Sequence, residues 1–279
     1  HEAFNLDLNK KASFSPSALN WYMDCGMKFY YSYIANLKER KEVNTEIDSS
    51  TFGSIFHRSV ELIYRKLTEF NKTIRKEDLE KLLESEWMIQ AYVDLAFKEL
   101  FFHVPEEEVP EYNGTQLINS KVIVTYVKQL LRNDLQYAPF EMVAMEKRVS
   151  ENIRVKVGNL LVNTRIGGII DRIDSKDNIL RIVDYKTGGS PKVPESIEEL
   201  FTPGEKRPNY IFQTFLYAAI MCRQQSQKVA PSLLYIHRAS SDTYSPVVEI
   251  DDLWEGRTPV YDFSRFEKEF RERLYFLLE

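Results

Sequence analysis

The first half of the chain carries hydrophobic residues at helical spacing. Ser15-Pro16-Ser17 is typical of a helix start, because serine caps a first turn and proline fits within it, and Leu19, Tyr22 and Met23 follow at helical intervals. Further helices are predicted from about Ser50 onward, over 76–99 and over 115–136, with an acidic, proline-containing loop at 104–114. The pattern therefore predicts a helical first half.

From Phe140 onward the pattern becomes alternating and rich in β-branched residues. It predicts strands over 141–146, 153–157, 160–173 and 179–186, then a helix over 208–224, a strand over 229–237 and an amphipathic helix over 263–278. Helices followed by neighbouring strands and then by further helix and strand predict an α+β or mixed α/β fold. In this fold, helices flank a central sheet that is mainly antiparallel or mixed.

The segment 167–188 predicts a β-hairpin that brings two carboxylates together. If Asp177-Asn178 occupies the tight turn, Asp171 lies opposite Asp184, with Cβ atoms about 4.5–5.5 Å apart. Two such charges destabilise a hairpin unless a cation lies between them or one takes up a proton. Because strand side chains alternate, Lys186 shares the face of Asp184 while Tyr185 points away. The hairpin thus predicts a site with two acids and one lysine.

Such a set suits metal-dependent hydrolysis of a phosphodiester. Carboxylates hold Mg²⁺ or Mn²⁺ through oxygen, and the metal polarises the phosphate and lowers the pKa of bound water. Lys186 then positions or deprotonates that water, or neutralises charge on the phosphorus. The alternative is an exposed hairpin whose Asp and Lys are only solvated, which is the commoner situation for an isolated Asp-x-Lys.

The composition is that of an ordinary folded protein. With 43% hydrophobic and 13% aromatic residues, a chain of 279 residues has enough apolar area to form a core. Its formal net charge of −5 is unusual for a nucleic-acid-binding domain, but a divalent-metal site itself requires carboxylates. Cys25 and Cys222 are too few for a disulfide framework, which predicts a reducing, cytoplasmic location. No run approaches the roughly 18 apolar residues of a membrane span, so no membrane partner is expected.

The hairpin motifs resemble those of a known family. Gly168–Asp174 and Val183–Gly188 resemble the GxxDRxD and VDYKTG signatures of RecB-like nucleases in the PD-(D/E)xK superfamily, including the nuclease domains of AddB-type helicase–nuclease subunits. The resemblance covers about residues 13–217. It implies a Mg²⁺- or Mn²⁺-dependent deoxyribonuclease, exonuclease-like and acting in DNA repair. DNA is the implied substrate and a helicase motor the implied partner.

The resemblance also implies a domain organisation. We expect one RecB-like nuclease domain over 1–279 with a restriction-endonuclease-like core. Within it, 71–138 form a helical insertion, 140–240 hold the catalytic sheet and the motif helix, and 262–279 form the C-terminal helix. Because the chain begins with His1 and not Met, we expect it to be a fragment of a longer protein.

Further site residues follow from the resemblance. His57, in a GxxxH helix, and the backbone carbonyl of Tyr185 are the implied metal ligands beside Asp171 and Asp184, although a lone histidine of this kind is more often packed or solvated. Gln213 and Tyr217 match a QxxxY motif that supports the active site and approaches DNA. Arg172 is included among these supporting residues.

Cys25 lies in a motif that resembles the first iron–sulfur ligand of AddB-type proteins. The other three cysteines of that cluster are missing, so no iron–sulfur cluster is expected in this chain, and Cys25 is interpreted as a small buried hydrophobe. Glu61, one turn after His57, is interpreted as a surface acid. Glu146 is either an additional acid near the metal or a partner in a cross-strand ion pair.

Several cations lie on the predicted strands. These cations are Lys147, Arg148, Arg154, Lys156, Arg165 and Arg172. They form either a local phosphate-binding face or a set of solvated strand positions.

An alternative function is a catalytically inert DNA-binding or scaffolding module of the same fold. Loss of activity normally removes an acid or the lysine, and Asp171, Asp184, Lys186 and His57 are all present, which favours an enzyme. Motifs of other enzyme classes, including GxxxxGK[ST] and His-Glu-x-x-His, are missing, so any motor lies elsewhere. Cutting polarity, strand preference, exo- or endonuclease action and oligomeric state stay open.

Overall fold

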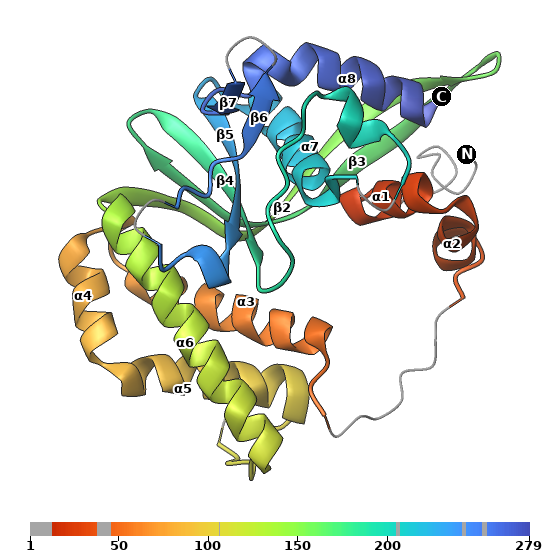
Figure 1. Ribbon diagram of the computed structural model, residues 1–279. Helices are drawn as coiled ribbons and strands as arrows, with labels where there is room; N and C mark the ends of the chain where they lie inside the picture. Colours follow the sequence, from red (N-terminus) through yellow and green to blue (C-terminus); the bar gives the residue numbers. More distant parts are fainter. Residues whose placement is uncertain (1–12, 38–45, 106, 205–206, 242–243, 253–255) are drawn as a thin grey trace.

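The computed structural model describes residues 13–37, 46–105, 107–204, 207–241, 244–252 and 256–279 (Figure 1). Its main helices are α1 (Pro16–Asp24), α2 (Gly26–Phe29), α3 (Ser49–Leu67), α4 (Lys76–Glu84), α5 (Glu86–Phe97), α6 (Gly114–Tyr137), α7 (Asn209–Gln224) and α8 (Ser264–Leu278). Short π-helical segments η2 (Tyr30–Ile34) and η3 (Lys98–Phe102) follow α2 and α5, and 3-10 turns lie at η4 (Glu198–Phe201) and η5 (Ile236–Arg238).

The central sheet has five strands in the order β1-β2-β3-β4-β5. They are β1 (Thr73–Ile74), β2 (Phe140–Val157), β3 (Leu160–Lys176), β4 (Ile179–Lys186) and β5 (Lys228–Tyr235), and a separate two-stranded sheet pairs β6 (Glu249–Asp252) with β7 (Gly256–Pro259). The first three pairings are antiparallel, and β4 pairs with β5 in parallel. The predicted fold class, a mainly antiparallel mixed sheet with flanking helices, is confirmed.

Hydrophobic cores lie on both faces of the sheet. On one face, α7 and α8 pack against strand residues such as Ile173 and Ile182. On the other, α3, α4, α5 and α6 pack against Val183 and Tyr185, and Figure 1 shows these four helices gathered on one side. Alternate residues of β4 thus face opposite cores, as expected for a central strand buried on both sides.

Two predicted elements have different bounds in the structure. The helix predicted over 76–99 is divided at Ser85, whose φ of −106° and ψ of 66° are not helical. The strands predicted over 141–146 and 153–157 form the single strand β2. That strand passes through an irregularity between Met142 and Ala144 and through Glu146, which has a φ of 49°. Bulges of this kind bend a strand without ending it, so a local break in alternation does not mark a strand end.

A buried network of charges joins α3 and α6 to the sheet. Arg172 of β3 lies 2.6 Å from Asp134 of α6 and 2.6 Å from Asp174, and Arg181 of β4 lies 3.0 Å from Asp174. Tyr64 of α3 donates a hydrogen bond to Asp134. Charges this deeply buried require such partners, because desolvation costs several kcal/mol for each ion.

The helices α4, α5 and α6 lie within the range 71–138. The prediction that this range is an insertion in one nuclease domain stays a prediction. Within the described residues, every helix is too short or too polar to cross a bilayer.

Candidate metal centre

The hairpin of β3 and β4 has the predicted register. Its pairs run from Lys176 opposite Ile179 to Arg172 opposite Val183, and Asp177 and Asn178 form the turn with φ of 51° and 62°. Two successive left-handed residues are typical of a type I′ turn, which Asp and Asn tolerate because their short polar side chains suit this conformation. One residue beyond the last pair, this register places Asp171 opposite Asp184.

A third acid comes from β2. The pairs Met145–Arg172 and Lys147–Ile170 leave Glu146 opposite Asp171, so acids of three neighbouring strands lie side by side. A left-handed backbone is uncommon for glutamate, and residues in such conformations concentrate at functional sites. Of the two roles considered for Glu146, its position favours the acid near the metal.

His57 completes this cluster from α3. Its Nδ1 lies 3.5 Å from Oδ2 of Asp171 and 4.0 Å from Oε1 of Glu146. One ligand atom from each of these three residues lies within 4.8 Å of the other two. The ring packs edge-on against Tyr185, with centroids 5.7 Å apart, which helps to hold its orientation.

Asp184 and Lys186 lie beside the cluster and contact each other. Lys186 Nζ is 2.6 Å from Oδ2 of Asp184 and 4.3 Å from the ring centroid of Tyr210. Gln213 of α7 donates a hydrogen bond of 2.8 Å to Oδ1 of Asp184. Both carboxylate oxygens of the buried Asp184 thus have a partner, Lys186 on Oδ2 and Gln213 on Oδ1.

His57 and Asp171 form a charged pair. Burial lowers the pKa of His57, but the charge of Asp171 and a hydrogen bond to it outweigh this effect and raise that pKa to about 9. Burial raises the pKa of Asp171, but His57 and the 2.8 Å hydrogen bond from the Tyr185 amide hold that pKa below its usual value. Without metal, the imidazolium therefore neutralises the carboxylate.

Asp184, Glu146 and Lys186 also have shifted pKa values. Burial raises the pKa of Asp184 to about 6, and burial with the charge of Asp171 raises the pKa of Glu146 to about 7. Burial opposes the charge of Lys186, but Asp184 outweighs it and raises the pKa of the ammonium. Repulsion among crowded acids is the condition that a divalent cation relieves.

The donor set fits a divalent metal. One imidazole nitrogen with two or three carboxylate oxygens suits Mn²⁺, and oxygen-rich sites suit Mg²⁺. The cluster opens into a cleft of ≈ 560 Å³ lined by the start of α3, including Ser49, Ser50 and Ser54. The residues present can hold the ion and leave space for a substrate beside it.

The two residues of the QxxxY motif have different surroundings in the structure. Gln213 contacts Asp184, as described above, whereas Tyr217 is 4% exposed and packs against Gly168 of β3. A Cβ atom at Gly168 would lie 2.6 Å from the Tyr217 hydroxyl. Tyr217 is therefore a core residue beside β3, and its supporting role stays a prediction.

Three interpretations were wrong. Arg172 is fully buried, so it is neither part of a phosphate-binding face nor a solvated position, and only its supporting role stays a prediction. Glu61 is 7% exposed and pairs with Arg58 and Arg65, so it is not a surface acid. Cys25 is exposed between α1 and α2, so it is not a buried hydrophobe. For Arg172, the packing of α6 on the strand decided the environment.

Sequence analysis did not identify Tyr210, whose ring forms a cation–π contact with the ammonium of Lys186. Its position three residues before Gln213 on one helix was an available signal, because residues at this spacing share a face. The role of the Tyr185 carbonyl as a metal ligand stays a prediction. So does that of Cys25 as an iron–sulfur ligand, which holds only if a longer parent protein has the three missing cysteines.

Comparisons with known proteins agree with this geometry. The family described as the PD-(D/E)XK nuclease superfamily matches residues 13–276. Similar curated proteins are ATP-dependent helicase/deoxyribonuclease subunits B. That of Carboxydothermus hydrogenoformans is 27% identical over 62% of this chain, and that of Clostridium tetani is 26% identical over 64%. That of Clostridioides difficile is 25% identical over 65%.

The matched part of the chain spans 16% of the length of each of these relatives. The family match, in contrast, includes nearly every described residue, and with it the cluster of His57, Asp171, Asp184 and Lys186. On these grounds the chain belongs to the PD-(D/E)XK nuclease superfamily.

Proposed function

We propose that this chain is a deoxyribonuclease domain that hydrolyses DNA phosphodiesters with a bound divalent metal. One observation carries the proposal: His57, Glu146 and Asp171 converge from three separate elements onto one point beside Asp184 and Lys186. Family membership supports the same reaction class.

The proposed metal ligands are the side chains of His57, Glu146, Asp171 and Asp184 and the backbone carbonyl of Tyr185. When bound, Mg²⁺ or Mn²⁺ supplies positive charge that polarises the phosphodiester and lowers the pKa of a water molecule. The carboxylates provide the oxygen ligands that both ions prefer, and the imidazole favours acceptance of Mn²⁺. That the bound ion is Mg²⁺ or Mn²⁺ is part of the proposal.

Lys186 acts on the phosphate as a cation. Its raised pKa keeps the ammonium charged, and Asp184 and the Tyr210 ring hold it at a defined place. A fixed positive charge stabilises negative charge that develops on the phosphoryl oxygens in the transition state. Of the roles considered for Lys186, charge neutralisation is therefore better supported than deprotonation of water.

The wider context follows from the relatives. Their printed name describes an ATP-dependent helicase and deoxyribonuclease subunit, so we propose DNA as the substrate, an exonuclease-like action and a helicase motor as the partner. Residues 71–138 are proposed as a helical insertion within one nuclease domain. We propose a cytoplasmic location, because Cys25 and Cys222 are too few for a disulfide framework.

The test uses end-labelled single- and double-stranded DNA with Mg²⁺, Mn²⁺ or EDTA. We expect metal-dependent cutting that Lys186→Ala reduces by a factor of at least about 100, the usual effect of losing one transition-state charge contact. Lys81→Ala, at an exposed position on α4, is the matched control and should cut normally. Absence of cutting by the folded protein with every metal would contradict the proposal and favour the inert binding module.

A further inference from the structure

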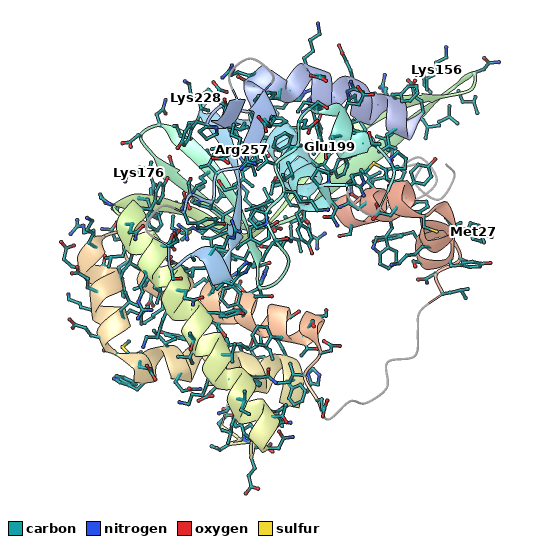
Figure 2. All side chains as sticks on the ribbon, in the orientation of Figure 1. Met27, Lys156, Lys176, Glu199, Lys228 and Arg257 are labelled. Carbon is teal, nitrogen blue, oxygen red and sulfur yellow. The ribbon has the colours of Figure 1, made fainter. Side chains whose placement is uncertain are left out.

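The hairpin of β2 and β3 continues well beyond the strands that flank it. β3 pairs with β4 only from Arg172 to Lys176, whereas its pairing with β2 runs on to Val157 opposite Leu160. Figure 1 shows the end of this hairpin projecting past α8, and Figure 2 shows Lys156 at that end. Such an extension exposes a long strand face to solvent.

The two faces of the extension differ in charge. One face contributes Val149, Ile153 and Val155 to the core, and its acid Glu151 pairs with Arg271 at 3.1 Å and with Arg223 at 2.8 Å. The opposite face, which we call the basic face, consists of Arg148, Ser150, Asn152, Arg154 and Lys156 of β2 with their partners Ile169, Gly167, Arg165, Asn163 and Leu161 of β3. The basic face carries four cations and no acid, although the chain has a net charge of −5.

Two guanidinium groups of the basic face donate hydrogen bonds to side-chain amides. Arg154 donates to Asn163 at 3.1 Å, and Arg165 donates to Asn152 at 3.0 Å, each across the strand pair. In the part of the chain that the structure describes, Arg148, Arg154 and Lys156 form no ion pair with a carboxylate. The neutral partner of Arg154 orients its guanidinium and leaves its charge available to a phosphate.

The basic face leads to the metal centre. Arg148 pairs with Ile169, and two residues further along each strand lie Glu146 and Asp171. At about 3.3 Å per residue, the span from Arg148 to Lys156 is about 27 Å. A row of cations that ends beside the ligands is suited to align a phosphate backbone with the site of hydrolysis.

We propose that the basic face binds the phosphate backbone of the DNA and guides it to the metal centre. The inference rests on the proposed function and adds to it the path of the substrate. Phosphate contacts position a nucleic acid without reading its sequence, so the contact is expected to be independent of sequence. Lys147, whose side chain belongs to the other face, and the buried Arg172 are not part of it.

The experiment measures DNA affinity as a function of salt in EDTA, where no cutting takes place. Single- and double-stranded oligonucleotides are separate arms and identify which form the face binds. The variant Arg148→Ala/Arg154→Ala/Lys156→Ala is compared with Lys76→Ala/Lys81→Ala/Lys268→Ala, which removes the same charge from exposed positions on α4 and α8. Circular dichroism confirms that both variants are folded.

We expect the slope of log K against log salt to become shallower by about 2 to 3 in the first variant, since each phosphate contact contributes about 0.7–0.9. The control should keep the slope of the unmodified chain. Equal slopes in all three proteins, or an equal reduction in both variants, would overturn the inference. The cutting assay separates the two hypotheses. Cutting by a chain whose salt slope is the same in the Arg148→Ala/Arg154→Ala/Lys156→Ala variant supports the nuclease and overturns the inference, whereas a reduced slope in a chain that never cuts supports the phosphate contact without the nuclease.

Discussion

Gly168 shows how one residue supports the centre from a distance. The absence of a side chain on β3 leaves room for the Tyr217 ring, and Tyr217 shares its helix with Gln213, which donates to Asp184. A series of contacts therefore connects Gly168, through Tyr217 and Gln213, to the carboxylate of Asp184.

Gly168→Ala is expected to destabilise the protein by about 1–3 kcal/mol, the usual cost of overpacking a core. The new Cβ lies 2.6 Å from the Tyr217 hydroxyl and 3.1 Å from its ring, so the helix must shift and carry Gln213 with it. Urea unfolding measures the stability. The variant Gly168→Ala/Tyr217→Phe should recover part of the loss, and Gly114→Ala, where the new atom meets nothing within 4 Å, should show none. A Gly168→Ala protein of normal stability would contradict the steric argument.

The pKa of His57 predicts pH-dependent metal binding. Because this pKa is raised to about 9, the ring carries a proton at neutral pH that a metal must displace. Mn²⁺ affinity should therefore rise with pH up to about 9, by as much as roughly tenfold per unit for one proton released. Calorimetry at several pH values gives the dependence. The His57→Gln variant should bind Mn²⁺ more weakly, and its affinity should depend less steeply on pH. An affinity of the unmodified chain that does not change with pH would exclude the ion pair of His57 with Asp171.

At the scale of elements, the buried charges hold α3, α6, β3 and β4 together. Tyr64 is on the same helix as His57, and Arg172 directly follows Asp171, so the network fixes two ligand-bearing elements relative to each other. Asp174→Asn, which leaves Arg172 and Arg181 with uncompensated charge, is expected to cost about 3–5 kcal/mol of stability.

The pH dependence gives a second test of this network. Burial opposes the charge of Asp174, but Arg181 and Arg172 outweigh it and hold its pKa below the usual value. Its stabilising contribution is therefore complete above about pH 4, the pKa expected in the unfolded chain, and is lost as the pH falls through the lower folded-state pKa. Urea unfolding should show the difference between the unmodified chain and Asp174→Asn shrinking below about pH 4. A difference that stays constant into acid would show that Asp174 does not act through its charge.

At the scale of the whole molecule, the two hydrophobic cores share one sheet. Residues of β4 contribute to both cores, and the charge network crosses between α6 and the strands. We expect the protein to unfold in a single cooperative transition, with coincident curves from far-ultraviolet circular dichroism and tryptophan fluorescence. Circular dichroism reports on the helices of both cores, whereas the fluorescence of the partly buried Trp21 reports on the core that α1 joins. Two separate transitions would identify the helices of 71–138 as an independent domain.

Local sequence patterns were enough to predict most elements and the register of the hairpin that carries the two acids and the lysine. The turn Asp177-Asn178 sets the register of β3 and β4, and with it the relation of Asp171, Asp184 and Lys186, because hairpin geometry depends on residues close together in the chain. Periodicity determined most of the helices for the same reason.

Which distant residues lie beside that hairpin depends on how the elements pack. Glu146 reaches Asp171 because β2 continues through an irregularity that breaks its alternation, and Tyr210 reaches Lys186 because α7 packs on the sheet. The burial of Arg172 likewise depends on α6 covering the strand. These relations arise from packing between segments far apart in sequence, which local patterns of polarity do not encode.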